Sequence, residues 1–334
     1  MDNAKIAFDI IPDGQSAPRG YTRINCHMIF DINIEDFRRK TRLVASGNMK
    51  ETPKCQTYSS VVSRETVRTA LTMSALNELK VKDGEIMNAY LTAPITEKVW
   101  TVLGKEWGPD AGKKAIIMRA FYGLKSAGAA FCKHLADCMR VIGYKSCPDD
   151  HDIWYKASFD LDGDKYYSYV LCYVDNILVV HHDKMPIMNN INKFFLLKPY
   201  SVGDPNMYLG AKIKYHKTPN GVWSWKMSLS NYVHEACKNL KDHLSNTFDE
   251  KYKLPKQAPK PFVMGYEAEL DTSTLCDPEE ASYFQSIIGV MPWMIEIGRV
   301  DISTEVSMLS SFLAMPSVGH LEEAKKCHGI FVVK

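Results

Sequence analysis

The chain has no pair of cysteines at Cys-x-x-Cys spacing, although it contains nine cysteines in 334 residues. An odd number of scattered cysteines argues against a disulfide framework and a zinc site, and indicates a reducing compartment. No apolar run approaches the roughly 20 residues that a membrane helix needs. The first ten residues include Asp2, Lys5 and Asp9, which is not the pattern of a secretory signal peptide. We therefore expect a soluble intracellular protein, cytoplasmic or nuclear, that is not secreted.

The net charge is also small, because the 41 Lys and Arg residues nearly balance the 39 Asp and Glu residues, which gives a formal charge of +2. Any contact with nucleic acid must then come from local basic clusters. The sequence lacks a Gly-x-Ser-x-Gly motif, a glycine loop for phosphate and a Cys/His pairing that would support another chemistry. His181 and His182 are adjacent, so on a strand they point to opposite faces and are expected at a solvated strand end.

One acidic residue interrupts the most apolar stretch of the chain, residues 170–180, where Asp175 is followed by Asn176. A carboxylate in such a run is costly unless the chain turns there or the acid is used. Strands over 168–174 and 177–181, joined by an Asp-Asn turn, would place Asp175 at a hairpin tip. The segment alone leaves open a hairpin with a polar turn and a metal-binding carboxylate.

Other patterns indicate mixed helix and strand. The expected helices are 64–79, 126–142, 184–197 and an amphipathic helix from Ser230. The expected strands are a pair within 20–47, a strand over 85–91, and a pair joined at Asn220-Gly221 that includes 208–215. A lysine-rich segment with prolines, 248–261, is typical of a linker.

Several short motifs follow one another in the order of one protein family. They are 58–71, 88–91, 121–127 and 173–175, with Arg42-Leu43-Val44-Ala45 upstream and 208–213, 287–289 and 301–303 downstream. With these motifs the chain resembles the reverse transcriptase, an RNA-directed DNA polymerase, of copia-type LTR retrotransposons. The resemblance spans about residues 5–334, nearly the whole chain.

The resemblance implies an α+β, right-hand polymerase fold. Fingers and palm would occupy residues 1–215, and a thumb with a partial, connection-like helical region would occupy 216–334. The family usually continues into a ribonuclease H domain, so the chain is expected to be truncated before it. The implied partners are an RNA template, a DNA primer and deoxynucleotides.

The resemblance also implies nucleotidyl transfer with two Mg²⁺ ions about 3.5–4 Å apart, held by three aspartates. The matching positions here are Glu85, Asp175 and Asn176. Glutamate moves the carboxylate outward by about 1.5 Å, and asparagine lacks the charge that a hard dication prefers. Glu85 and Asp175 are thus the expected metal ligands. Asp83 could add a third carboxylate on a continuous strand, but Gly84 favours a turn.

The positions that would bind the nucleotide and the primer match the family better than the metal-binding positions do. Tyr90 corresponds to the residue that crowds a ribose 2′ hydroxyl, with a buried core residue as the alternative. Lys40 and Arg42 correspond to contacts with the triphosphate, with a solvated charged face as the alternative. Tyr122 and Lys125 lie in the loop beside the nucleotide, which is expected to be looser because Ser126 and Gly128 replace the usual Gln and Pro. Finally, the resemblance assigns primer binding to Tyr208, Leu209 and Gly210.

These substitutions leave catalysis open. The favoured hypothesis is a truncated and catalytically impaired copy, a pseudoenzyme. One alternative is a weakly active enzyme that prefers Mn²⁺, because Mn²⁺ generally binds oxygen ligands more tightly than Mg²⁺. The other alternative is a non-catalytic nucleic-acid-binding module.

Overall fold

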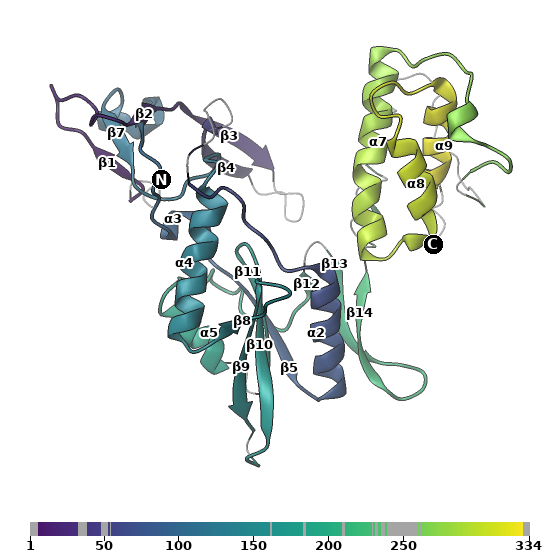
Figure 1. The fold of residues 1–334 in the computed structure, drawn as a ribbon, viewed down its shortest axis with the longest axis horizontal. Coiled ribbons are helices and arrows are strands. Elements are labelled where there is room, and N and C mark those ends of the chain that lie inside the picture. Colours follow the sequence, from purple (N-terminus) through teal and green to yellow (C-terminus); the bar gives the residue numbers. More distant parts are fainter. Residues whose placement is uncertain are drawn as a thin grey trace. The chain divides into compact units, whose positions relative to one another are not determined.

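The computed structural model describes residues 6–32, 39–47, 53, 55–160, 162–182, 185–208, 211–228, 230, 233–234, 238, 260 and 262–329. Within these ranges, no helix combines the length and the apolar character needed to cross a membrane. The chain forms two compact units, Met1–Asp204 and Pro205–Lys334 (Figure 1). The boundary between the compact units lies after Asp204, whereas residue 215 lies inside strand β13 (Ala211–Lys217), and the expected division into fingers with palm and thumb stays a prediction.

The first unit is organised around an antiparallel five-stranded sheet. Its strand order is β5-β11-β10-β9-β8. The strands are β5 (Lys80–Glu85), β8 (Lys145–Ser146), β9 (Ile153–Phe159), β10 (Lys165–Tyr173) and β11 (Asn176–His181). The apolar run noted in the sequence supplies the two central strands, whose side chains are buried on both faces because helices cover both.

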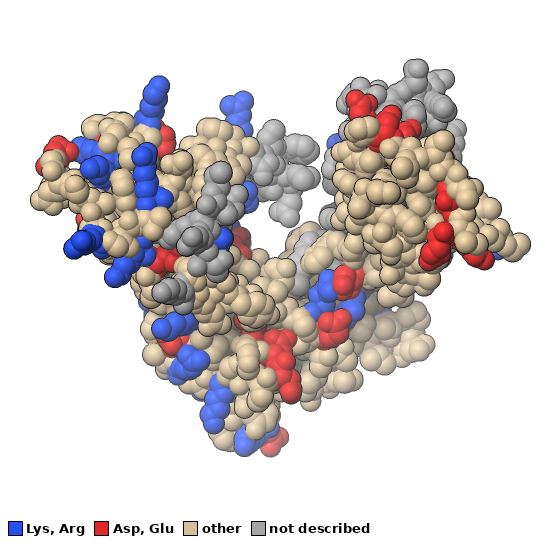
Figure 2. Space-filling model, turned by 45° about the horizontal axis from the view of Figure 1, so that its top comes forward, with Lys and Arg blue, Asp and Glu red and all other residues tan. Residues whose placement is uncertain are grey.

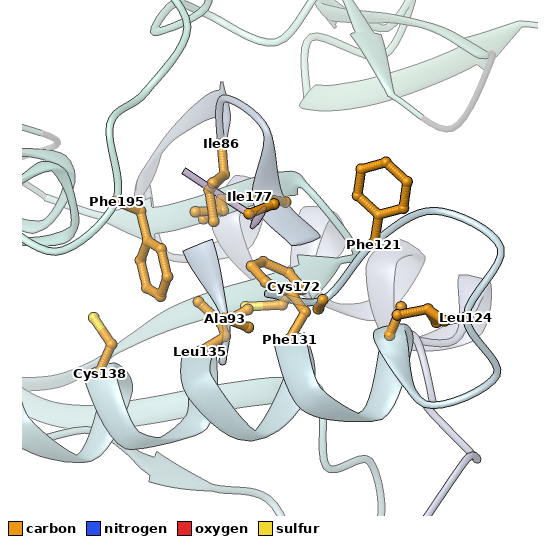
Figure 3. Close-up of a cluster of buried hydrophobic side chains, with 14 of the residues drawn as sticks. Ile86, Ala93, Phe121, Leu124, Phe131, Leu135, Cys138, Cys172, Ile177 and Phe195 are labelled. Carbon is orange, nitrogen blue, oxygen red and sulfur yellow. The ribbon is translucent and has the colours of Figure 1, made fainter. Parts of the chain in front are cut away.

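Helices pack on the two faces of this sheet (Figure 1). One face carries α4 (Ala127–Val141) and α5 (Met185–Asn192), and the other carries α2 (Arg64–Leu76). Figure 3 shows Phe131 and Leu135 of α4 beside Cys172 and Ile177 of the sheet, all of them buried in one core cluster. The apolar residues of α4 recur at helical spacing, so a single face of the helix supplies this core.

Helix α2 begins at a capping site that ties it to a distant loop. The Ser63 hydroxyl accepts a hydrogen bond from the Thr66 N–H at 3.1 Å. The Asp150 carboxylate accepts from the Ser63 N–H at 3.0 Å and from the Thr66 hydroxyl at 2.6 Å. These bonds satisfy donors that the first turn of a helix otherwise leaves open.

The outer edge of β5 is covered by the segment that follows α5. Asp83 and Gly203 exchange backbone hydrogen bonds of 3.1 and 3.2 Å, and the Met87 N–H donates to the Leu196 carbonyl at 2.8 Å. The segment 196–203 therefore runs along the last strand of the sheet.

A second, four-stranded sheet of the first unit has the order β1-β7-β6-β2, and a separate two-stranded hairpin pairs β3 with β4. The strands of the four-stranded sheet are β1 (Phe8–Ile10), β2 (Thr22–Arg23), β6 (Val99–Val102) and β7 (Lys114–Ile117), and those of the hairpin are β3 (Cys26–Ile32) and β4 (Arg39–Ala45). The short helices of this part of the chain are α3 (Ala89–Thr92) and η2 (Lys105–Asp110). The same hydrophobic cluster continues into this region through Phe8, whose ring packs edge-on against Trp107 and Phe121.

The second unit contains a three-stranded sheet and a group of helices. The sheet has the order β12-β13-β14, and the long helix α7 starts at a capping box between Asp277 and Glu280. Its elements are β12 (Met207–Tyr208), β13 (Ala211–Lys217), β14 (Trp223–Ser228), η4 (Ala268–Leu270), α7 (Pro278–Ile297), η5 (Val300–Ile302), α8 (Ser303–Ser310) and α9 (Val318–Gly329). Phe284, Ile288 and Leu309 are among the residues of its own buried core.

Asp271 connects the start of α9 with the segment before α7. Its carboxylate accepts hydrogen bonds from the Tyr266 hydroxyl at 3.0 Å, the Ser273 N–H at 2.9 Å and the Ser317 hydroxyl at 2.9 Å. Partial burial acts to raise the pKa of Asp271, but these hydrogen bonds outweigh it and lower the pKa to about 2. The charged carboxylate is therefore the form that the folded unit favours.

The predicted helix 126–142 and the Asn220-Gly221 hairpin are confirmed, and the helix predicted over 64–79 forms but ends at Leu76. The strand expected over 85–91 is wrong, because β5 ends at Glu85 and Asn88, with φ of 53°, leads into the helical turn α3. The helix expected over 184–197 ends at Asn192. Most of the helix expected from Ser230, and nearly all of the linker at 248–261, lie outside the described residues.

Candidate functional site

A cavity of about 570 Å³ opens in the first unit where five segments of the chain meet. These segments are β4, the end of β5 with α3, the loop before α4, the β10–β11 turn and the residue Lys198. The polar side chains that line it are Thr41, Arg42, Glu85, Asn88, Tyr90, Tyr122, Asp175 and Lys198.

The turn between β10 and β11 places Asp175 at the cavity. Tyr173 pairs with Asn176, so the two turn residues are Val174 and Asp175, and the expected Asp-Asn turn is wrong by one position. Val174 has φ of 53°, which is unusual for a β-branched residue. The Asp175 carbonyl accepts a hydrogen bond of 2.7 Å from the Ile86 N–H, which joins this turn to the end of β5.

Glu85 is the last residue of β5 and lies opposite Asn176 in the sheet. Its carboxylate forms an ion pair with the Lys198 ammonium group. The backbone supports this arrangement, because the Lys198 N–H donates to the Glu85 carbonyl at 2.8 Å and the Glu85 N–H donates to the Ser201 hydroxyl at 3.1 Å. Ser201 in turn donates to the Lys198 carbonyl at 2.9 Å.

We call the Glu85 and Asp175 carboxylates the acidic corner of the cavity. Burial is the main cause that raises the pKa of Asp175, and the nearby Glu85 carboxylate raises it further, while the Lys198 ammonium acts in the opposite direction. The Asn176 amide donates to the Asp175 carboxylate at 3.4 Å. The two acids of the corner therefore have one cation, Lys198, and one amide donor, Asn176, beside them.

Two tyrosines form the wall beside the acidic corner. The rings of Tyr90 and Tyr122 lie 4.9 Å apart at 54°, and Tyr90 also packs against Phe131 at 6.0 Å. Burial, followed by the Asp175 carboxylate among other neighbours, raises the pKa of both hydroxyls. Both tyrosines therefore stay neutral and present an aromatic surface with hydroxyl groups to the cavity.

The Tyr122 loop is held against β4 by a close backbone contact. The Ala45 N–H donates to the Tyr122 carbonyl at 2.7 Å. Gly123 has φ of +90°, and a Cβ atom there would lie 2.0 Å from the Ala45 carbonyl oxygen. Only glycine fits this contact, which brings Arg42 on β4 near Tyr122, where its charge acts on the tyrosine's pKa.

The next part of this loop is anchored at Ser126, and whether it is looser than in relatives, as expected from Ser126 and Gly128, stays a prediction. The buried Glu97 carboxylate accepts a hydrogen bond from the Ser126 N–H at 3.1 Å and a second, short one from the Ser126 hydroxyl. A buried carboxylate that receives two such bonds fixes the start of α4.

Five of the residues expected at the site meet at the cavity. They are Arg42, Glu85, Tyr90, Tyr122 and Asp175.

Other expected residues lie elsewhere. Asn176 and the half-buried Lys125 are not among the described residues that line the cavity. Lys40 belongs to β4, but its side chain lies outside the described part, as do Leu209 and Gly210. Tyr208 is buried in the second unit.

Asp83 also does not line the cavity, although Gly84 beside it lies in β5 and makes no turn. Lys198 is the residue that sequence reasoning missed. Its position one residue after the expected helix 184–197 gave no indication that it would meet Glu85.

The donors at the acidic corner do not fit a pair of divalent ions. No group of three or more His, Cys, Asp and Glu side chains placed to hold a metal occurs within the described ranges. Two close dications need several converging carboxylates. Here one of the two available acids is already paired with Lys198.

Residues 13–251 match the family model described as reverse transcriptase (RNA-dependent DNA polymerase). The chain is 26% identical to the retrovirus-related Pol polyprotein from transposon RE1 of Arabidopsis thaliana, over 99% of this chain and 22% of the relative. It is 23% identical to the corresponding polyprotein from transposon TNT 1-94 of Nicotiana tabacum, over 92% of this chain and 23% of the relative. The chain thus spans about a fifth of the length of these two relatives.

Among solved structures, a foamy viral protease-reverse transcriptase in complex with double-stranded DNA is similar at 12% identity with a TM-score of 0.46. The match covers 98% of this chain and 46% of that one.

Proposed function

Because the chain belongs to the reverse transcriptase (RNA-dependent DNA polymerase) family, as a copia-type domain, we propose that it is an RNA-directed DNA polymerase by descent with impaired catalysis. The observation that carries the proposal is the state of the acidic corner. Glu85 is paired with Lys198, and the residue after Asp175 is the neutral Asn176. The pocket therefore offers little free negative charge to a metal ion.

In this proposal the parts of a right-hand polymerase are assigned as follows. The five-stranded sheet with α2, α4 and α5 is the palm, and the four-stranded sheet with the β3–β4 hairpin forms the fingers. The second unit is the thumb and connection-like region. This assignment is supported by the position of Asp175 in a hairpin turn at the end of the central strands.

The wall of the cavity suits an incoming deoxynucleotide. Arg42 would bind phosphate oxygens, because a guanidinium group matches their geometry. Tyr90 and Tyr122 present aromatic surface to the sugar and base, and Tyr90 would crowd a ribose 2′ hydroxyl. By the family resemblance, Lys40 and Lys125 are assigned to nucleotide binding, and the segment Tyr208, Leu209 and Gly210 is assigned to primer binding.

Primer extension on an RNA template, in Mg²⁺ and separately in Mn²⁺, tests the proposal. The natural chain is compared with the double variant Glu85→Asp, Asn176→Asp. A matched control, Glu65→Asp with Asn220→Asp, makes the same chemical changes at exposed positions that are not among the residues lining the cavity.

The proposal expects negligible synthesis by the natural chain and the control, and a rate at least about 100-fold higher for the double variant, because a displacement of about 1 Å at a reacting centre has an effect of this order. Equal synthesis by the natural chain and the double variant would contradict the proposal. If neither the natural chain nor the double variant synthesises DNA, the substitutions at Glu85 and Asn176 are not the cause of the inactivity. Synthesis by the natural chain in Mn²⁺ alone would instead support the weakly active, Mn²⁺-preferring enzyme.

The second candidate function, a non-catalytic nucleic-acid-binding module, is favoured by basic side chains at one end of the first unit. Figure 2 shows Lys and Arg side chains gathered where the four-stranded sheet lies, and Arg19, Arg23, Lys98 and Lys105 are exposed there. Fluorescence anisotropy with an RNA–DNA hybrid at increasing salt would detect this binding, because phosphate contacts weaken as salt rises. Binding without synthesis in both the natural chain and the double variant would support the module.

A further inference from the structure

Lys198 pairs with the acidic corner. Its ammonium forms the ion pair with Glu85, and its charge also acts on Asp175. The side chains of Lys198 and Glu85 are 41% and 31% exposed, so the pair is partly open to solvent and partly screened by it.

The backbone keeps Lys198 in this place. The Lys198 N–H donates to the Glu85 carbonyl at 2.8 Å, and the Ser201 hydroxyl donates to the Lys198 carbonyl at 2.9 Å. The two residues are far apart in sequence, and these bonds hold their backbones side by side without help from the ion pair. Glutamate has one methylene more than aspartate, which lets its carboxylate extend from the end of β5 to the ammonium.

The charges around the cavity therefore cancel. Among the described residues, the charged side chains that line it are Arg42 and Lys198, each +1, and Glu85 and Asp175, each −1 when ionised, a formal sum of zero. A hard dication binds through negatively charged oxygen ligands, and a fixed positive charge within a few ångströms opposes its binding.

We propose that the Lys198 ammonium serves as the resident cation of the acidic corner and sets its low affinity for divalent metal ions. In the natural chain a metal ion must displace the ammonium from Glu85 before it can use both carboxylates. The inference concerns the same pocket as the proposed function and rests on that assignment only for its biological meaning, because metal binding is measured without polymerisation.

Titration of the purified full chain with Mn²⁺, followed by the electron paramagnetic resonance signal of free Mn²⁺, tests the proposal. The main variants are Lys198→Met and Lys198→Gln, and Lys198→Arg keeps the charge. The matched control is Lys193→Met, since Lys193 is exposed and bonds to Asn190 at 3.0 Å, away from the cavity. Thermal melting confirms that each variant folds, as expected because the backbone bonds of Lys198 do not need its side chain.

We expect Lys198→Met and Lys198→Gln to bind Mn²⁺ about tenfold more tightly or better, and Lys198→Arg and Lys193→Met to stay within about twofold of the natural chain. Adding Asp175→Asn to Lys198→Met should remove the gain, which would locate the ion at the acidic corner. Unchanged affinity in both main variants, or an equal gain in Lys193→Met, would overturn the proposal.

This result is separable from the outcome of primer extension. Tighter Mn²⁺ binding with a silent Glu85→Asp, Asn176→Asp chain would support the resident cation and reject the proposed function. Restored synthesis in the Glu85→Asp, Asn176→Asp chain, with no change in Mn²⁺ affinity in the Lys198 variants, would support the proposed function and reject the resident cation.

Discussion

The contact between Gly123 and the end of β4 predicts a large loss of stability on substitution by alanine. Two costs add at this position. An L-residue at φ of +90° costs about 1 kcal/mol. The new Cβ would also lie 2.0 Å from the Ala45 carbonyl oxygen, so the backbones must separate and the 2.7 Å bond from Ala45 to Tyr122 is strained. Such overpacking adds about 2–3 kcal/mol.

Gly163→Ala is the matched control, because Gly163 has φ of +87° but nothing within 4 Å of its would-be Cβ. We expect the free energy of unfolding of the first unit to fall by about 3–4 kcal/mol in Gly123→Ala and by about 1 kcal/mol in Gly163→Ala. With a urea dependence of about 2–3 kcal/mol per molar, the midpoints would fall by about 1–2 M and less than about 0.5 M. Urea denaturation followed by circular dichroism measures both. Equal midpoints for the two variants would refute the steric argument.

Two further predictions concern the second unit. Gly319→Ala would place a Cβ 1.8 Å from an Asp271 carboxylate oxygen, and thermal melting should show a loss of about 1–3 kcal/mol, whereas Gly289→Ala, with nothing within 4 Å, should be neutral or slightly stabilising. The folded pKa of Asp271, about 2, lies below the ordinary value of 3.8, so its contribution is present above about pH 4 and is lost as pH falls toward 2. Acid titration of this unit should therefore show a smaller loss of stability in Asp271→Asn, and an unchanged acid transition would contradict the assignment.

The sequence predicted the parts of the fold that depend on local periodicity. Helices α2 and α4 carry apolar residues at helical spacing over several turns, and the β10–β11 strands come from an apolar run that is broken only at the turn between them. The sequence did not predict where β5 ends. Gly84 suggested a turn, but in the structure it lies in β5 with the Met188 side chain 3.3 Å from a would-be Cβ, so tertiary packing explains this glycine.

The candidate site was predicted where the family resemblance covers it, as at Asp175, Tyr90 and Arg42. Lys198 was missed because its partner, Glu85, lies 113 residues away and no spacing rule connects them. The turn was misplaced by one residue because the positive φ falls on Val174, a residue type that rarely adopts it. Long-range pairing and strained backbone are set by the whole fold, so local patterns carry no signal for them.

The segment 196–203, described above along β5, also determines how copies of the molecule behave toward one another. An uncovered strand border offers unpaired N–H and C=O groups to which another chain can add a strand. On the β5 side, those groups are already used within the molecule by Leu196 and Gly203. On the opposite side, the border strand β8 has only two residues. The central sheet thus presents little template for strand addition along its β5 border, and crowded solutions of this chain should resist association through that border.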